Sequence, residues 1–142
     1  MRVFPVEAVG RNMRDHTKLR VFELADALAV EIYKITALFP KTEIYGLTSQ
    51  MRRAAVSIPS NIVEGCARAT QKEYVQFLQI AFGSLRELHY QLNLSGKLGY
   101  CTEPDYSHIT QRIIETEKVL NALIRSLYKL SCFKPSVYQP SA

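Results

Sequence analysis

One stretch decides the fold of this chain: Leu47-Thr-Ser-Gln-Met-Arg-Arg-Ala-Ala-Val-Ser-Ile-Pro-Ser-Asn-Ile-Val-Glu-Gly65. At the helical period its apolar residues fall on one face, namely Leu47, Met51, Ala54, Ala55, Ile58 and Ile62. The opposite face carries Gln50, Arg53, Ser57, Asn61, Glu64 and Arg68. A solvated helix face usually carries scattered Lys and Glu, whereas this one aligns an arginine, small hydroxyls, an amide and a carboxylate. The pattern indicates a surface used for a partner, and therefore a binding module more than an enzyme.

The composition is that of one globular domain. The chain has 142 residues, 47% of them hydrophobic and 22% charged, which is enough to build a core without a disulfide or a metal. The net charge of +5 permits contact with nucleic acid but does not require it. Three cysteines without a CxxC pair, and no apolar signal segment at the N-terminus, lead us to expect a reduced, cytoplasmic protein. No apolar run is long enough to span a membrane.

Hydrophobic periodicity predicts an all-α protein. Four amphipathic helices are expected, over residues 18–39, 47–68, 71–97 and 104–131. The short connections favour an antiparallel up-down-up-down four-helix bundle formed by residues 18–131. Residues 1–17 and 132–142 follow no helical period, so we expect flexible tails there. A basic arm that contacts phosphate is the alternative for the first of them.

Local signals mark the beginnings of the helices and two irregular points inside them. Thr48 or Ser49 can cap the second helix, and Thr70-Gln-Lys-Glu73 is a capping box for the third. Pro59 lacks the N–H that a helix needs, so we expect a continuous helix with a kink, in which Ser57 and Ser60 satisfy the freed backbone groups. Gly83 lies in mid-helix, where it favours close approach of another helix.

The apolar faces are wider than a monomeric bundle requires. Val75 and Phe82 widen the main stripe of the third helix, and Ile114 and Val119 lie outside the stripe of the fourth. Excess apolar width on two helices predicts a subunit interface, and therefore a homo-oligomer.

Patterns that carry catalysis or bind metal are missing from the sequence. None of the three histidines, His16, His89 and His108, stands four residues from another, and no glycine-rich phosphate loop follows a strand. We therefore predict no catalytic residue, no metal ligand and no cofactor, and an enzyme is the least favoured class.

The strongest candidates for a binding site are four basic residues, which are expected to gather around the hairpin between the second and third helices: Arg52, Arg53, Arg68 and Lys72. An arginine can bind a phosphate through two hydrogen bonds. Arg52 is the best placed for an outside partner because it lies off the Arg53-Ser57-Asn61-Glu64 line. The alternative is that these cations form salt bridges within or between subunits, for example Arg53 with Glu64 or with Glu87 of a neighbour.

At these residues the sequence resembles a known family. Tyr45-Gly-Leu-Thr-Ser-Gln-Met-Arg-Arg-Ala-Ala-Val-Ser-Ile-Pro-Ser-Asn-Ile-Val-Glu-Gly65 closely resembles the signature of the four-helix-bundle proteins encoded by intervening sequences in bacterial 23S ribosomal RNA genes. The resemblance covers about residues 13–130. Its further matches are Arg14–Phe22, Phe39–Pro40, Glu73–Leu78, Ala81–Leu88 and Leu98–Tyr100.

The resemblance implies a left-handed up-and-down bundle that assembles as a homopentamer with a central pore, and it assigns no catalytic or metal residue. A more distant relative is the accessory variability determinant of diversity-generating retroelements, a basic pentamer that binds nucleic acid and a reverse transcriptase. Five subunits of +5 each would carry about +25, so that weak patches on single subunits could combine into a strong ring.

Two functions follow as hypotheses. The first is a non-enzymatic homo-oligomer that binds RNA or DNA, alone or with a nucleic-acid-processing protein, through Arg52, Arg53, Arg68 and Lys72. The second is a protein-interaction scaffold in which the polar motif Ser57, Pro59, Asn61 and Glu64 serves fold and assembly instead of nucleic acid.

Overall fold

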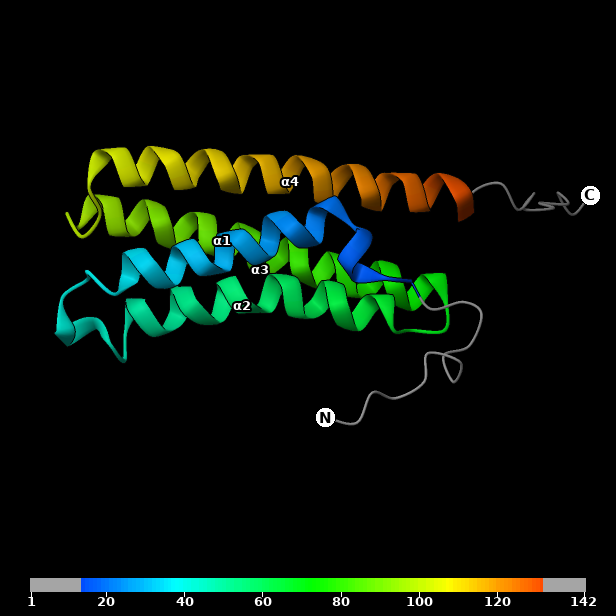
Figure 1. Ribbon diagram of the computed structural model, residues 1–142, viewed down its shortest axis with the longest axis horizontal. Helices are drawn as coiled ribbons and strands as arrows, with labels where there is room; N and C mark the ends of the chain where they lie inside the picture. Colours follow the sequence, from blue (N-terminus) through cyan, green and yellow to red (C-terminus); the bar gives the residue numbers. More distant parts are fainter. Residues whose placement is uncertain (1–13, 132–142) are drawn as a thin grey trace, which may run out of the picture.

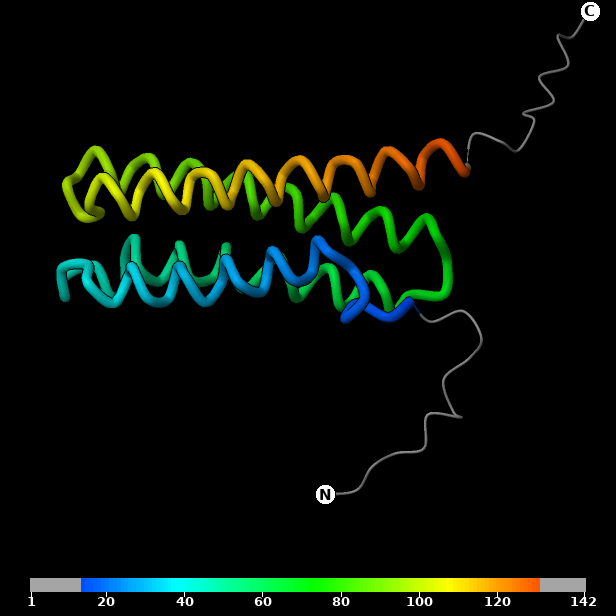
Figure 2. Tube along the Cα trace, turned by 45° about the horizontal axis from the view of Figure 1, so that its top comes forward, coloured from blue at the N-terminus to red at the C-terminus, as the bar shows by residue number. Residues whose placement is uncertain are grey.

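The computed structural model of the chain describes residues 14–131, which form four long helices and two short 3-10 turns. In chain order the elements are η2 (His16–Lys18), α1 (Arg20–Thr36), η3 (Lys41–Glu43), α2 (Leu47–Cys66), α3 (Gln71–Lys97) and α4 (Glu103–Ser131). Each helix runs opposite to the one before it (Figure 1). Turned by 45°, the pair α1 and α2 lies beside the pair α3 and α4 (Figure 2). The predicted all-α antiparallel four-helix bundle is confirmed.

One apolar core runs along the bundle and takes side chains from all four helices. Twelve large side chains are less than 2% exposed: Leu28, Ile32, Met51, Ile58, Ile62, Leu78, Leu85, Leu88, Leu92, Ile109, Ile113 and Leu120. Burying an aliphatic side chain of this size stabilises a fold by roughly 1.5–3 kcal/mol. The stripe predicted for α2 is part of this core, because Met51, Ala54, Ala55, Ile58 and Ile62 are all buried.

The first helix is shorter than its hydrophobic pattern indicated. It ends at Thr36, before Pro40, and the chain then turns so that Phe39 is buried against Tyr100, with ring centroids 5.6 Å apart. At the other end, residues that were expected in the N-terminal tail form η2. There the Asp15 side chain accepts a hydrogen bond from the Thr17 amide at 3.0 Å. Residues 1–13 and 132–142, the rest of the expected tails, lie outside the described residues.

The prediction that Thr48 or Ser49 caps α2 is wrong. Gly46 occupies the N-cap position, and Thr48 is buried inside the first turn. The Leu47 amide donates instead to Oε2 of Glu43 at 2.9 Å. The turn η3 makes this possible, since it places a carboxylate one turn ahead of the helix, where the orphan amides and the helix dipole favour negative charge.

The second helix runs unbroken through Pro59, as predicted, and Pro59 is buried. The predicted capping box of α3 is also confirmed. The Thr70 hydroxyl accepts from the Glu73 amide at 3.2 Å, and the Glu73 carboxylate accepts from the Thr70 amide at 3.4 Å.

No described helix of the same chain approaches Gly83 closely, and within the chain the close approach occurs at Gly65. A Cβ at Gly83 would meet no described atom within 4 Å, because the residue faces outward. A Cβ at Gly65 would lie 2.9 Å from Cβ of Phe77 and 3.3 Å from the carbonyl oxygen of Tyr74. Gly65 therefore lets the end of α2 pack directly on the first turns of α3.

Candidate nucleic-acid interface

The polar motif of α2 is used inside the bundle. The Ser57 and Ser84 hydroxyls hydrogen bond at 2.8 Å and so join α2 to α3. The Asn61 amide donates to the carbonyl oxygen of Ser57 at 2.7 Å and to its hydroxyl at 3.0 Å. The structure thus differs from the expected role of Ser57 and Ser60 at the proline, because Ser57 bonds across to α3 and Ser60 is exposed.

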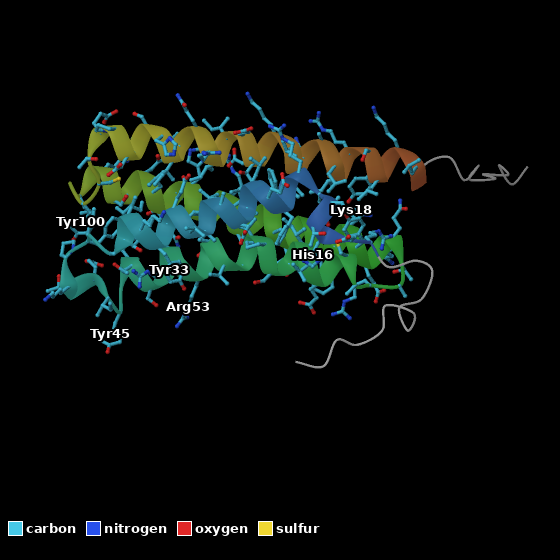
Figure 3. The ribbon with its side chains drawn as sticks, in the orientation of Figure 1. His16, Lys18, Tyr33, Tyr45, Arg53 and Tyr100 are labelled. Carbon is cyan, nitrogen blue, oxygen red and sulfur yellow. The ribbon has the colours of Figure 1, made fainter. Side chains whose placement is uncertain are left out.

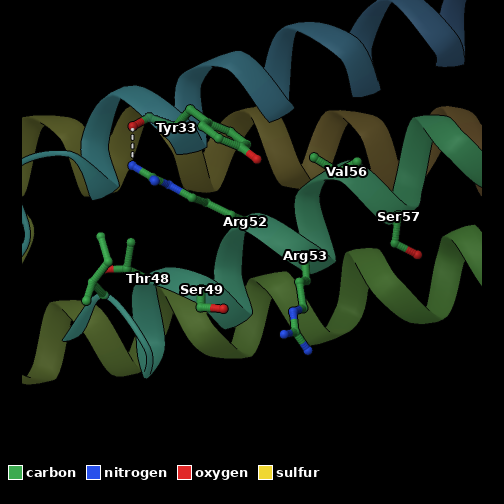
Figure 4. Close-up of a pocket in the computed structure, with 8 residues that line it drawn as sticks. Tyr33, Thr48, Ser49, Arg52, Arg53, Val56 and Ser57 are labelled. Carbon is green, nitrogen blue, oxygen red and sulfur yellow. Dashed lines mark hydrogen bonds between the residues drawn. The ribbon is translucent and has the colours of Figure 1, made fainter.

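Arg52 is held by α1. Its Nε donates to the Thr36 hydroxyl at 2.9 Å and its Nη2 donates to the Tyr33 carbonyl at 3.4 Å. Its guanidinium carbon lies 4.7 Å from the centroid of the Tyr33 ring, a cation–π distance. Figure 4 shows this side chain reaching from α2 toward Tyr33. The arginine that the sequence favoured for an outside partner is therefore held by contacts within the chain.

Arg53 points away from the bundle (Figures 3 and 4). It is exposed and forms no ion pair with any residue in the range 14–131. At about 1.5 Å of rise per residue, Arg53 lies roughly 20 Å from the end of α2 at Cys66, and Arg68 lies beyond that end. The expected cluster is thus split, because Arg52 and Arg53 lie far from Arg68 and Lys72.

Arg68 and Lys72 lie instead at one end of the bundle. Arg68 pairs with Glu64 at 2.6 Å and covers the Phe77 ring at 4.7 Å. Its carbonyl accepts a hydrogen bond from Arg14 at 3.3 Å, and the Arg14 guanidinium lies 4.2 Å from the centroid of the Tyr74 ring. The residues before α1 thereby bring a further cation to the hairpin between α2 and α3.

The last turns of α4 complete this end. The Gln71 amide donates to the carbonyl of Leu127 at 2.9 Å, so the start of α3 and the end of α4 lie side by side. Figure 3 shows Lys18 at the same end. We call the six cations gathered here the basic end: Arg14, Lys18, Arg68, Lys72, Arg125 and Lys129. Sequence reasoning missed four of them because they come from segments about 50 residues or more from the hairpin, or from the expected tail.

Three carboxylates near the basic end are already engaged. Glu64 pairs with Arg68, and Glu73 accepts from Thr70. Asp15 accepts from Thr17, and this hydrogen bond lowers the pKa of the Asp15 carboxyl. Lys72, Arg125 and Lys129 are exposed and form no ion pair with any described residue. Their charge is therefore available to an anionic partner.

Beneath the basic end lies a buried pair, Cys66 and Tyr74. Burial raises the pKa of the Cys66 thiol, and burial together with Cys66 raises the pKa of Tyr74 to about 12. A thiol that stays protonated is a poor nucleophile and a poor metal ligand. The pair therefore acts in packing.

Each histidine contacts a neighbouring side chain. His89 lies 3.2 Å from Glu117, which also pairs with Arg86, and His108 lies 3.4 Å from Glu31. His16 contacts the Phe22 ring edge to face. Among residues 14–131 no three His, Cys, Asp or Glu side chains are grouped so that they could hold a metal ion.

None of the helices in the described part of the chain has the length and apolar character of a membrane span.

The fold and the site together define a small four-helix bundle with a cationic end. The model of the 23S rRNA-intervening sequence protein family matches residues 17–122, and the chain belongs to this family. It is also similar to the crystal structure of a protein of unknown function from the S23 ribosomal protein family of Bacteroides thetaiotaomicron, with a TM-score of 0.69 and 25% sequence identity over 74% of this chain and 95% of that chain. No curated protein matches the chain.

Proposed function

We propose that the protein is a non-enzymatic, cytoplasmic homo-oligomer, pentameric as the family resemblance implies, that binds RNA or DNA through its basic end. One observation carries the proposal. Lys72, Arg125 and Lys129 come from two helices to one end of the bundle and are exposed without a carboxylate partner among residues 14–131. Cations arranged in this way bind a phosphate backbone with little regard to sequence.

Assembly would strengthen a weak contact. A single basic end offers a few phosphate contacts, but several copies in one oligomer raise the effective concentration of each for a long nucleic acid. Arg68 contributes less than Lys72, since Glu64 neutralises it. Arg52 contributes least, because Thr36 and Tyr33 hold it. A protein that processes nucleic acid would join the complex by binding the same nucleic-acid strand.

The alternative function, a protein-interaction scaffold, is favoured by a different observation. Ser57 and Asn61 hydrogen bond within the bundle and Pro59 is buried, so this part of the polar motif serves the fold. This function needs no nucleic acid. It predicts that neutralising the basic end leaves the binding of partners by the oligomer unchanged.

The test compares two triple variants that remove equal charge. Lys72→Ala, Arg125→Ala and Lys129→Ala neutralise the basic end, and Lys34→Ala, Lys41→Ala and Lys97→Ala are the matched control at the opposite end. Binding to a structured RNA hairpin and to duplex DNA is followed by fluorescence anisotropy from about 50 to 300 mM salt. We expect the basic-end variant to bind at least tenfold more weakly, with a salt slope lower by about 0.7–0.9 for each phosphate that the variant no longer neutralises.

Three results would contradict the proposal. The first is a wild-type protein that shows no salt-dependent binding at about 50 mM salt. The second is a control variant that loses as much affinity as the basic-end variant. The third is a wild-type protein that is monomeric in solution, which refutes the oligomer while leaving binding by the basic end to the anisotropy measurement.

A further inference from the structure

The first feature that the fold of a single chain does not explain is a hollow between α1 and α2. It has a volume of about 510 Å³, and its lining combines three apolar residues with five polar ones: Tyr33, Ile44, Val56, Thr48, Ser49, Arg52, Arg53 and Ser57 (Figure 4). These three apolar side chains are 46%, 51% and 42% exposed. We call the space lined by these eight residues the α1–α2 hollow. Exposed apolar surface that is rimmed by polar groups marks a site of interaction.

The second feature is a stripe on the outer side of α3, formed by Ile80, Gly83, Glu87 and Tyr90. Spacings of three and four residues place all four on one face of the helix. Ile80 is 52% exposed and Tyr90 is 65% exposed. Gly83 weakens the helix and has no described neighbour that would require a glycine. We call this stripe the α3 ridge. Its small central residue would let a helix from another molecule approach closely.

Each surface carries a charge without an opposite partner. Arg53 and Glu87 form no ion pair within the described residues, and Glu87 accepts only the Gln91 amide, at 3.2 Å. The contact between Ser57 and Ser84 sets Arg53 about level with Glu87 across the two antiparallel helices. No N–O distance of 4.0 Å or less nevertheless joins them. The cation and the carboxylate therefore both remain available to a second molecule.

We infer that the α3 ridge of one copy docks in the α1–α2 hollow of a second copy, with Glu87 of the first copy beside Arg53 of the second. The inference rests on the homo-oligomer in the proposed function and names its contact surface. The two surfaces match in length, since Ile80 to Tyr90 spans about 15 Å and the lining from Thr48 to Ser57 about 14 Å. Because different elements meet, the contact is head to tail, and repeating it closes a ring or extends a filament.

The central experiment is a mixing test on two charge reversals, Arg53→Glu and Glu87→Arg. Each variant alone brings like charges together at every contact, so we expect both to sediment as smaller species than the wild type in analytical ultracentrifugation. Mixed in equal amounts, they restore opposite charges at each contact between unlike copies, which is every contact in a filament or an even-numbered ring and four of the five contacts in a pentamer. We therefore expect the larger species to return. A salt bridge within one chain cannot produce this recovery, since each variant carries two like charges on the same molecule.

A second variant separates assembly from folding. Gly83→Gln places a helix-favouring side chain on the ridge. At a concentration at which the protein is monomeric, the helical circular dichroism should be unchanged and the Tm the same or higher, while the dissociation constant of the oligomer rises at least tenfold. Lys118→Glu reverses an exposed charge on α4 outside both surfaces. It is the matched control for the two charge reversals and should leave assembly unchanged.

The possible outcomes distinguish failure of this contact from failure of the proposed oligomer. A wild-type oligomer that persists in both charge reversals and in Gly83→Gln overturns the ridge-in-hollow contact but leaves the proposed oligomer and its nucleic-acid binding intact. Smaller species from each reversal without recovery on mixing also overturn it. A wild-type protein that is monomeric at all concentrations overturns this contact and the proposed oligomer together, whatever the anisotropy experiment shows.

Discussion

Gly65 and Gly83 both lie in long helices, but they have opposite surroundings. Gly65 is closed in by Phe77 and Tyr74, and an added Cβ would approach Cβ of Phe77 to 2.9 Å. Gly83 is open, with nothing described within 4 Å of an added Cβ. The first glycine is required by the contact of α2 with α3, whereas nothing in the single chain requires the second. A glycine inside a helix thus reveals a close contact only when the facing element is known.

Arg52 and Arg53 repeat the same contrast one residue apart. Arg52 points at α1, where it reaches Thr36 and stacks on Tyr33. Arg53 points outward and pairs with no described residue. A step of one residue turns a helical side chain by about 100°. Of two neighbouring identical residues, one can therefore pack within the bundle while the other faces solvent.

The largest expected effect on the free energy of unfolding is that of substituting Gly65, the enclosed glycine. Gly65→Ala forces Phe77 or the backbone of Tyr74 to move, and overpacking of this kind costs about 1–3 kcal/mol. Gly83→Ala is the matched control, and it should stabilise a single chain by up to about 1 kcal/mol, because alanine is the better helix former. Urea unfolding at a concentration low enough to keep the protein monomeric measures both. If Gly65→Ala were as stable as the wild type, the contrast between the two glycines would be refuted.

A smaller effect is expected from Tyr74, which lies in the same closed region. Its pKa of about 12 in the folded chain exceeds the ordinary 10.0, so between pH 10 and 12 the folded chain binds more protons than the unfolded chain. The free energy of unfolding therefore falls as the pH rises through this window, by about 1.4 kcal/mol at pH 11.

The measurement for Tyr74 is urea unfolding of the wild type and of Tyr74→Phe at pH 8 and at pH 11. The variant cannot ionise at this position, so it should lose less stability over that range than the wild type. Equal losses in the two proteins would mean that Tyr74 titrates as it does in the unfolded chain, and that the end of α2 is less closed than its burial indicates.

The smallest effect separates the two arginines. Arg52→Ala removes hydrogen bonds to Thr36 and Tyr33 and the stacking on the Tyr33 ring, which should cost about 1 kcal/mol. Arg53→Ala should change the stability of a single chain by less than about 0.5 kcal/mol, since it removes an exposed side chain. Thermal unfolding of the monomer compares them directly. Equal losses would show that the difference in their contacts has no energetic consequence.

Most of the fold could be predicted from the sequence. The capping box at Thr70, the unbroken helix through Pro59 and the buried stripe of α2 depend on residues close together in the chain, and all three are confirmed. The N-cap of α2 could not be predicted, because η3 brings Glu43 forward to Leu47 in place of the expected hydroxyl. The end of α1 was missed because the burial of Phe39 and a turn before Pro40 outweigh the helical period.

Less of the candidate site could be predicted. The sequence named Arg68 and Lys72, but their companions Arg125 and Lys129 join them only because α4 ends beside the start of α3. It also grouped Arg52 and Arg53 with them, although both lie far along α2. Ser84, the partner of Ser57, carried no signal in the sequence, because the contact depends on how α2 and α3 are aligned.

The sequence by itself determined the class and number of the helices, the apolar stripes and the family, since these follow from the helical period and from short local motifs. The tertiary structure alone decided which glycine is enclosed, which arginine is free and which cations share an end. Those properties depend on the rotation and alignment of each helix against neighbours that are distant in the chain. Packing of the whole core sets that alignment, and no local motif encodes it.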